Sequence, residues 1–195
     1  MTQRFRLSLV IPTLITLSTV FSVPTAIAQQ RIDCDSNEIF SVAACPGDSL
    51  DAEEQKLFNL INDYRLQNGL PAIPLSPSLS LVANRHVRDM AENINGLTHN
   101  WSDCPSNTWS CMWEAPQRLG TPYPGNGYEN AYRSSLQASA ASALRSWRSD
   151  KPHREVILNQ GIWDEPWNAM GVGIYEGYAV MWVGREVDPA TPGSR

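Results

Sequence analysis

The chain has 195 residues, a formal net charge of −5 at pH 7 and 15 lysines and arginines. A net-negative chain without a basic run has no electrostatic case for binding nucleic acid. Its length suits one domain with a sizeable hydrophobic core.

The first 28 residues have the features of an export signal. Arg4 and Arg6 supply positive charge, residues 7–23 form an apolar run, and Ala26 and Ala28 supply the small residues that a signal peptidase reads. These features together predict a cleaved secretory signal over residues 1–28. The alternative is a transmembrane anchor, which needs roughly 20 clean apolar residues. We predict a secreted protein, extracellular or periplasmic, with no stable membrane insertion after cleavage.

Four cysteines in a chain bound for an oxidising compartment predict disulfide bonds. Three connectivities are possible. We favour the local pairs Cys34–Cys45 and Cys104–Cys111, because each closes a short loop. A zinc site built from cysteines would more typically show a Cys-x-x-Cys knuckle, and the chain contains none.

Residues 29–50 are polar and without a clear period, which predicts an N-terminal extension. From Asp51 the apolar spacing becomes helical, with acids in the first turn, where the helix dipole favours them. Gly69 and Pro71 end this first predicted helix. The apolar stripe consists of Leu57, Leu60, Ile61 and Tyr64.

A second helix is predicted from a cap at Ser78 to the Asn95–Gly96 pair. His86 lies four residues after Val82 and four before Met90, on the apolar stripe of this helix. We therefore interpret His86 as a core histidine that holds a hydrogen bond; a ligand role is the alternative.

Residues 97–134 show no helical or strand period, and a loop this long inside a domain is usually functional. A third helix is predicted over 135–149, ended by Pro152. Residues 154–161 are expected to run from a short strand into a turn.

Two strands, 169–175 and 178–183, are predicted to form a hairpin across Glu176–Gly177. The proline-containing end, residues 188–195, is predicted to be a disordered tail. Helices followed by a hairpin predict an α+β domain, with helices packed on an antiparallel sheet.

Several segments, in this order, resemble motifs of the CAP superfamily: the cysteine-rich secretory proteins, antigen 5 and pathogenesis-related proteins, also called SCP-like. Tyr128 is inserted in the segment that resembles the Gly-Glu-Asn motif. The resemblance covers roughly residues 52–184 and is closest to bacterial members. The segments are Leu57–Arg65 (LFNLINDYR), Asn68–Pro71 (NGLP), Ala83–Met90 (ANRHVRDM), Gly127–Ala131 (GYENA), Trp147–His153 (WRSDKPH) and Ala169–Gly173 (AMGVG).

The resemblance implies a three-layer α-β-α sandwich with a central antiparallel sheet, over a CAP domain of residues 51–187. It also implies a cleft lined by two histidines and two acids, which correspond to His99, Glu129, Asp150 and His153. Asp150 stands where many eukaryotic members have the longer glutamate. The Cys104–Cys111 loop falls between the first histidine and the first acid, so it could partly roof the cleft.

His99, His153 and Glu129 form a ligand set that zinc accepts, although no cofactor is required by the sequence. A metal-bound water, with Glu129 or Asp150 as base, would make a peptidase-like hydrolase conceivable. The alternative is a structural role, in which the four polar side chains only form hydrogen bonds with one another and tie loops together across the cleft. No Gly-x-Ser-x-Gly or His-Glu-x-x-His motif supports catalysis.

We therefore favour a secreted binding module over a metal-dependent hydrolase, and leave open whether the chain is an enzyme. The expected partner is a small apolar ligand or an extracellular or envelope component. Trp101, Trp109 and Tyr128 are expected to line the cleft.

Overall fold

The computed structural model describes residues 39–41, 46–105 and 108–193 of the chain. The predicted signal over residues 1–28 and the predicted pair Cys34–Cys45 lie outside these residues. Within the described ranges, no helix combines the length and the apolar character needed to cross a bilayer.

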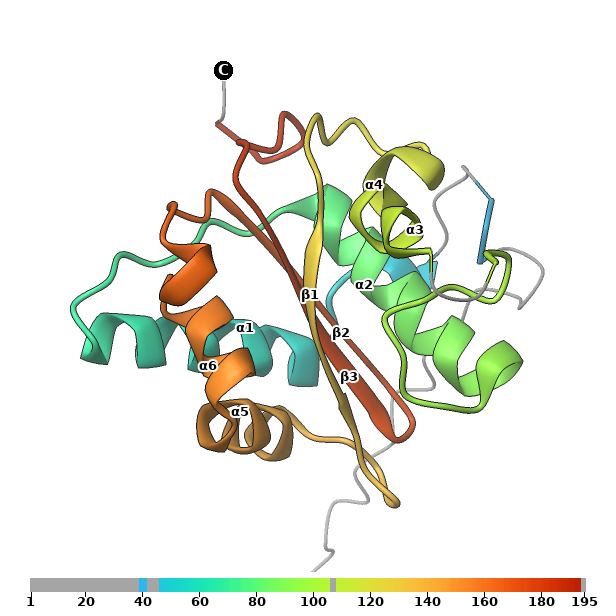
Figure 1. Ribbon diagram of the computed structural model, residues 1–195, viewed down its shortest axis with the longest axis horizontal. Coiled ribbons are helices and arrows are strands. Elements are labelled where there is room, and N and C mark those ends of the chain that lie inside the picture. Colours follow the sequence, from blue (N-terminus) through green and yellow to red (C-terminus); the bar gives the residue numbers. More distant parts are fainter. Residues whose placement is uncertain (1–38, 42–45, 106–107, 194–195) are drawn as a thin grey trace, which may run out of the picture. The chain divides into compact units, whose positions relative to one another are not determined.

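Three antiparallel strands form the central layer, in the order β1-β3-β2 (Figure 1). The predicted hairpin is present, and Glu176 takes the left-handed conformation in its turn, with φ of 48°. The edge strand β1 was not predicted, because its six residues lack a clear alternation of apolar and polar side chains. The strands are β1 (Tyr128–Arg133), β2 (Ala169–Tyr175) and β3 (Tyr178–Gly184).

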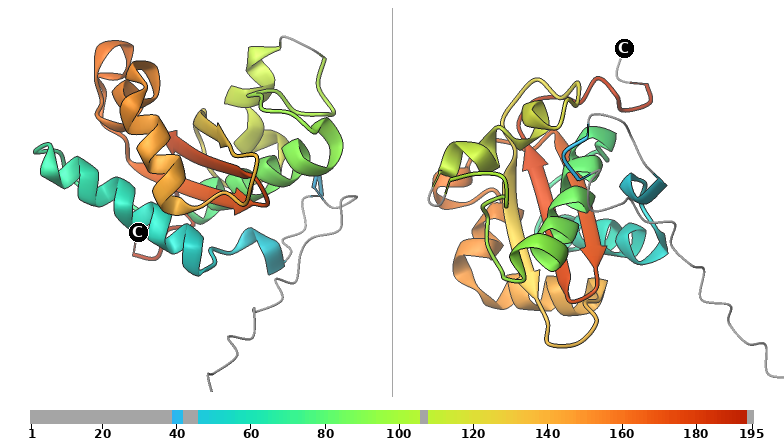
Figure 2. Two further views of the ribbon diagram at one scale, coloured as in Figure 1. Left: turned by 90° about the horizontal axis from the view of Figure 1, so that it is seen from below. Right: turned by 90° about the vertical axis from the view of Figure 1, so that its right-hand side faces the viewer.

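Three helices cover one face of the sheet: α1 (Ala52–Gln67), α5 (Ala140–Ser149) and α6 (Lys151–Ile157) (Figures 1 and 2). The first helix begins after Asp51 as predicted, where a capping box satisfies its first backbone N–H groups. The buried carboxylate of Glu54 also accepts the backbone N–H of Ile174 in β2 at 2.9 Å, which ties α1 to the sheet.

The other face is covered by α2 (Pro77–Asp89), which continues as a π-helical turn, η3 (Met90–Ile94), and by α3 (Trp109–Trp113) and α4 (Ala115–Arg118). Glycines in β2 let α2 pack directly on the strand. A Cβ at Gly171 would lie 2.1 Å from the carbonyl carbon of Leu79. The two helical layers and the sheet between them confirm the predicted α-β-α sandwich.

The region after β1 differs from its prediction. The helix expected from residue 135 begins only at Ala140, capped by Ser139. The short strand expected from residue 154 is instead part of α6. The predicted end of the third helix is confirmed, since α5 ends at Ser149. Pro152 lies in the first turn of the next helix, α6, where its missing N–H costs nothing and its φ already suits a helix.

The N-terminus of α2 also differs, because Ser76 and not Ser78 caps the helix, with its hydroxyl accepting the N–H of Leu79 at 2.9 Å. Beside it lies Asp188, the first residue of the predicted disordered tail. Asp188 is buried, and its carboxylate accepts the Ser76 hydroxyl at 2.6 Å and the Ser78 hydroxyl at 2.9 Å. The tail prediction is therefore wrong at this residue, since three hydroxyl and amide donors at the helix start bind the carboxylate.

Two short 3-10 helices complete the described elements: η2 (Pro46–Asp48) and η4 (Gly161–Trp163). Asp48 at the end of η2 forms a buried ion pair with Arg85 of α2, at 2.5 and 2.9 Å. This pair fixes the end of the predicted N-terminal extension against α2.

Candidate binding cleft

A cleft of about 420 Å³ lies beside β1. One wall comes from α3, the other from Tyr128 and η4, and His99 and Glu129 supply its polar groups. Its volume is within the range of pockets that take small molecules. The lining residues are His99, Trp109, Met112, Trp113, Tyr128, Glu129 and Trp163.

Glu129 joins two imidazoles beneath the cleft. An ionised carboxylate only accepts hydrogen bonds, so Nδ1 of His86 donates to Oε1 at 2.5 Å and Nδ1 of His99 donates to Oε2 at 2.7 Å. Burial by itself would raise the pKa of the Glu129 carboxyl, but the charge of His86 and the two hydrogen bonds outweigh burial and lower this pKa to about 2. Glu129 is therefore ionised, with one oxygen committed to each histidine.

His86 is held in its charged form by geometry. Its Nε2 faces the backbone carbonyl oxygen of Asn100 at 3.1 Å, and its Nδ1 faces Glu129. Both ring nitrogens face acceptors, so both must carry hydrogen. Burial lowers the pKa of His86, but the charge of Glu129 and the hydrogen bonds raise it above its ordinary value. The buried, hydrogen-bonded core histidine is confirmed, and its partner is the glutamate of the cleft.

Trp101 belongs to this buried group rather than to the cleft. Its side chain is buried, and its ring lies 4.5 Å from the ring of His86. The expectation that Trp101 lines the cleft is therefore wrong. It packs behind the histidine, where an aromatic ring shields the His86–Glu129 pair from water.

His99 is the imidazole that reaches the cleft. Its side chain is 36% exposed, and its ring lies 6.3 Å from the ring of Trp109. The hydrogen bond to Glu129 raises the pKa of His99, against the opposing effect of partial burial. With Nδ1 bonded to Glu129, Nε2 is the ring nitrogen left for a ligand, and no described residue forms a hydrogen bond with it.

Asp150 and His153 form a separate pair at the start of α6. Oδ2 of Asp150 accepts from Nδ1 of His153 at 2.6 Å and from its backbone N–H at 3.3 Å. The backbone carbonyl of His153 accepts the amide of Asn130 at 2.9 Å, which holds α6 beside β1. Neither Asp150 nor His153 lines the 420 Å³ cleft, so a single cleft shared by all four residues stays a prediction.

Among the described residues, no three histidine, cysteine, aspartate or glutamate side chains are placed to hold a metal ion. Glu129, one member of the predicted zinc set, has both oxygens engaged by imidazole N–H groups. The described residues as placed do not provide three converging ligands. Zinc binding by His99, His153 and Glu129 stays a prediction.

The cleft wall depends on local features of the loop that the sequence marked as functional. The predicted disulfide Cys104–Cys111 is present, and Cys111 lies within α3, between the two tryptophans that face the cleft. Gly127 is also required here, since a Cβ would lie 2.6 Å from the ring of Trp182 on β3. Sequence reasoning missed Met112, Trp113 and Trp163, because the placement of α3 and η4 on either side of one cleft depends on the tertiary fold.

The fold and the cleft together define the class of protein. It is a helix–sheet–helix sandwich with a histidine–glutamate pair in a cleft beside the edge strand β1. Residues 58–183 match the family model of CAP, the cysteine-rich secretory protein family. The match spans well over half of the chain, and the chain belongs to this family.

Individual relatives agree with this assignment. The uncharacterized protein YkwD of Bacillus subtilis (strain 168) is 27% identical over 128 residues, which cover 66% of this chain and 44% of YkwD. An extracellular SCP-domain protein from Bacillus anthracis str. Ames has a TM-score of 0.56 at 25% identity, covering 69% of this chain and 40% of that one. The chain thus spans less than half the length of each of these two relatives.

An outer surface protein from Borrelia burgdorferi has a similar fold, with a TM-score of 0.53 at 16% identity. The match covers 70% of this chain and 97% of that protein. At this identity the likeness supports the fold alone.

Proposed function

We propose that this chain is an exported CAP-domain binding module whose cleft takes a small apolar ligand. The observation that carries the proposal is the composition of the cleft: four aromatic rings and a methionine surround about 420 Å³. Trp109 is 58% exposed and Trp113 is 39% exposed. Large apolar side chains left open to water around a hollow are typical of ligand sites.

The polar groups of the cleft restrict the ligand further. Both oxygens of Glu129 bond to imidazoles and its side chain is buried, so the carboxylate has little capacity left for a ligand. Nε2 of His99 is then the main polar contact that the cleft offers. This arrangement suits a ligand with an apolar ring or chain and a single polar group, and it disfavours a ligand with many hydroxyls, such as a sugar.

Export is part of the proposal. The features of residues 1–28 support it, and the similar SCP-domain protein from Bacillus anthracis is an extracellular protein. The final compartment, whether periplasmic or extracellular, would follow from fractionating cells that express the full chain.

The binding proposal is tested with naphthol as a probe, because it combines an apolar ring with one hydroxyl. We expect saturable binding by calorimetry, and about a tenfold loss of affinity in both Trp109→Ala and His99→Ala, on the order of 1.4 kcal/mol each. Leu136→Ala, which truncates a 78% exposed side chain outside the cleft, is the matched control and should bind like the wild type. Equal affinity in all three variants would exclude the cleft as the site.

A metal-dependent, peptidase-like hydrolase is the second candidate, and one observation favours it. Glu129 fixes His99 with hydrogen on Nδ1, which leaves Nε2 as a proton acceptor whenever the ring is neutral. Because Nε2 is the one ring nitrogen left, His99 can be either the base of the hydrolase or a ligand of its metal, but not both. Zinc titration by calorimetry with His99→Ala and His153→Ala, beside hydrolysis of a quenched fluorescent casein, tests this candidate. Absence of hydrolysis with and without zinc would eliminate it.

A further inference from the structure

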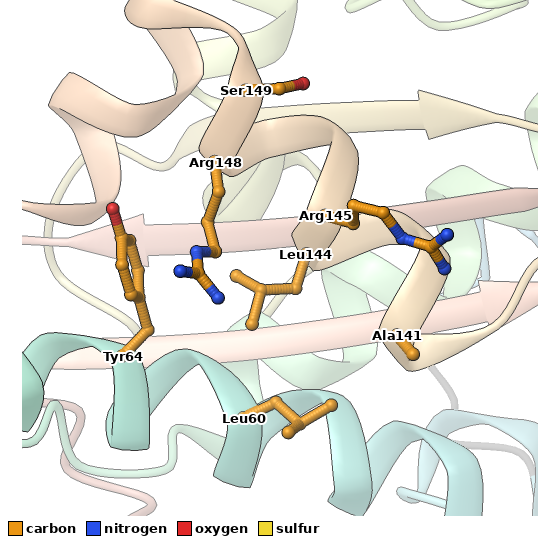
Figure 3. Close-up of a pocket in the computed structure, with 7 residues that line it drawn as sticks. All are labelled: Leu60, Tyr64, Ala141, Leu144, Arg145, Arg148 and Ser149. Carbon is orange, nitrogen blue, oxygen red and sulfur yellow. The ribbon is translucent and has the colours of Figure 1, made fainter.

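A second hollow lies between α1 and α5, and it shares no residue with the cleft. This α1–α5 groove has a volume of about 560 Å³ (Figure 3). The two helices supply different chemistry: α1 contributes an aliphatic and an aromatic side chain, and α5 contributes cations. The lining residues are Leu60, Tyr64, Ala141, Leu144, Arg145, Arg148 and Ser149.

The two arginines of the groove lack acidic partners. Arg145 and Arg148 are exposed, and neither forms an ion pair with a carboxylate of the described residues. The guanidinium of Arg148 lies 4.3 Å from the centre of the Tyr64 ring, an aromatic contact that holds it against the α1 side of the groove. In a chain of net charge −5, two unpaired cations on one helix face form a local positive surface.

The order of these side chains along the groove restricts what can bind. Figure 3 shows Leu144 between the two guanidinium groups, with Leu60 facing it from α1. The groove thus presents cation, apolar floor and cation in succession. A ligand that matches it carries an apolar group between two anionic groups, each of which can pair with one guanidinium.

A peptide supplies this pattern more readily than a lipid. A lipid anion has one charged head at the end of an apolar chain, whereas acidic and apolar side chains can alternate along a peptide. An adjoining hollow of about 300 Å³ extends the groove past Arg145, and three serines along it can exchange hydrogen bonds with a peptide backbone. That hollow is lined by Tyr132, Ser142, Arg145, Ser146 and Ser149.

We propose that the α1–α5 groove is a docking site for an acidic segment of a partner protein, in which an apolar residue lies between two carboxylates. Leu60 and Leu144 receive the apolar side chain, and Arg145 and Arg148 pair with the carboxylates. The site is independent of the cleft at His99, so the domain can hold a small ligand and a protein partner at once.

The test uses the full mature chain and a fluorescein-labelled peptide in which a leucine lies between two glutamates. We expect saturable binding by fluorescence anisotropy, weakened by added salt, and about a tenfold loss of affinity when Arg145→Gln and Arg148→Gln are combined. Lys151→Gln removes a neighbouring positive charge outside the groove lining and is the matched control, with affinity within about twofold of wild type. Leu144→Ala would disturb the core, so Leu60→Ala tests the apolar floor.

Three results would overturn the proposal. They are no binding of the acidic peptide, equal binding of a peptide with glutamines in place of the glutamates, and unchanged binding by the double arginine variant with a native circular dichroism spectrum. Binding to phosphatidylglycerol vesicles without binding to the peptide would also overturn it, in favour of a lipid surface. His99→Ala should bind the peptide with wild-type affinity, because the groove and the cleft share no residue. Failure of the proposed cleft function would therefore leave this result unchanged.

Discussion

The carboxylate of Glu129 carries a buried negative charge between two imidazoles, and the balance of these three groups decides how the cleft behaves. His86 lies on the core side and is held doubly protonated by Glu129 and the Asn100 carbonyl. His99 lies on the open side and takes up the second oxygen. The core histidine thus neutralises the glutamate, and the cleft histidine is oriented by it.

Replacing Glu129 by glutamine should be strongly destabilising, because the buried His86 imidazolium would lose its counter-charge. Breaking a buried pair from one side costs about 3–5 kcal/mol, which we expect as the loss in the free energy of unfolding by urea denaturation. Asp150→Asn is the matched control, since it changes the exposed acid–histidine pair and keeps a residue that caps helices well. A loss below about 1 kcal/mol for Glu129→Gln would contradict the buried ion pair, and the control should lose no more than that.

The same three groups predict a stability maximum in mildly acidic solution. The Glu129 pKa falls from 4.5 to about 2 on folding, so its contribution is complete above 4.5 and is lost as pH falls toward 2. The pKa values of His86 and His99 rise above 6.5, so their contribution is complete below 6.5 and is lost as pH increases through the raised values. Urea unfolding at about pH 3, 5.5 and 9 should give the highest stability at the middle value.

A flat profile across these three conditions would show that the pKa values do not change on folding. Titrating the His99 ring by NMR gives a separate reading. Its pKa should lie above 6.5 in the wild type and should fall in Glu129→Gln, because the hydrogen bond to the carboxylate is the main cause of the increase.

At the scale of the elements, α2 packs directly against the backbone of β2. Gly171 and Gly173 face the backbone of α2 where a Cβ would lie 2.1 and 2.6 Å from carbonyl carbons. The helix therefore rests on the strand itself rather than on its side chains. This contact places His86, on α2, within reach of Glu129 across the sheet.

Gly171→Ala should separate α2 from β2 and cost about 3 kcal/mol or more of unfolding free energy, because backbone atoms cannot yield as a flexible side chain can. Gly96→Ala is the control: its nearest atom would be Cγ2 of Ile94 at 3.7 Å, an ordinary contact. The measurement is the midpoint of thermal unfolding of both variants. Similar midpoints for the two variants would mean that the α2–β2 contact is looser than described.

Strong local signals allowed several elements to be predicted. The capped, evenly spaced stripe of α1 and the turn of the β2–β3 hairpin were visible in the sequence. The edge strand β1 and the start of α6 were not. The residues of β1 are ordered by long-range contacts, such as the Trp147 indole that donates to the Ala131 carbonyl at 3.1 Å. The start of α6 was missed although it carries local signals, since Asp150 caps the helix and Pro152 lies in its first turn.

The candidate site was predictable in part for the same reason. His99 and Glu129 were found through the resemblance to the CAP family, and the structure brings them together. His86 was assigned correctly to the core from its helical position. Nothing in the spacing of residues 86 and 129 shows that they meet, since 43 residues of chain separate them.

At the scale of the whole molecule, Asp188 ties the end of the domain to the start of α2 by hydrogen bonds. Its buried carboxylate accepts hydrogen bonds from the Ser76 hydroxyl, the Ser78 hydroxyl and the Ser78 backbone N–H. The segment that carries Asp188 is therefore part of the fold. The predicted domain end at residue 187 would leave these donors without their acceptor.

A chain ending at Val187 should therefore be less stable than one ending at Gly193, by about 2–3 kcal/mol, because the buried hydroxyls and the helix start lose a charged acceptor. Asp188→Ala in the full chain should reproduce most of this loss by urea denaturation. If the two shortened chains unfold at the same urea concentration, residues after 187 contribute nothing to the fold.

The Cys104–Cys111 bond decides when the aromatic wall of the cleft can form. It anchors the short helix that carries Trp109, Met112 and Trp113, and five residues of helix are too few to persist alone. A chain in which Cys104 and Cys111 are reduced would keep the hydrogen bond between His99 and Glu129, but it would lose the wall of the cleft that α3 supplies. Treatment with dithiothreitol should accordingly weaken naphthol binding while the sheet and the major helices remain. Oxidation of Cys104 and Cys111 would then act as a maturation step that completes the aromatic wall of the cleft.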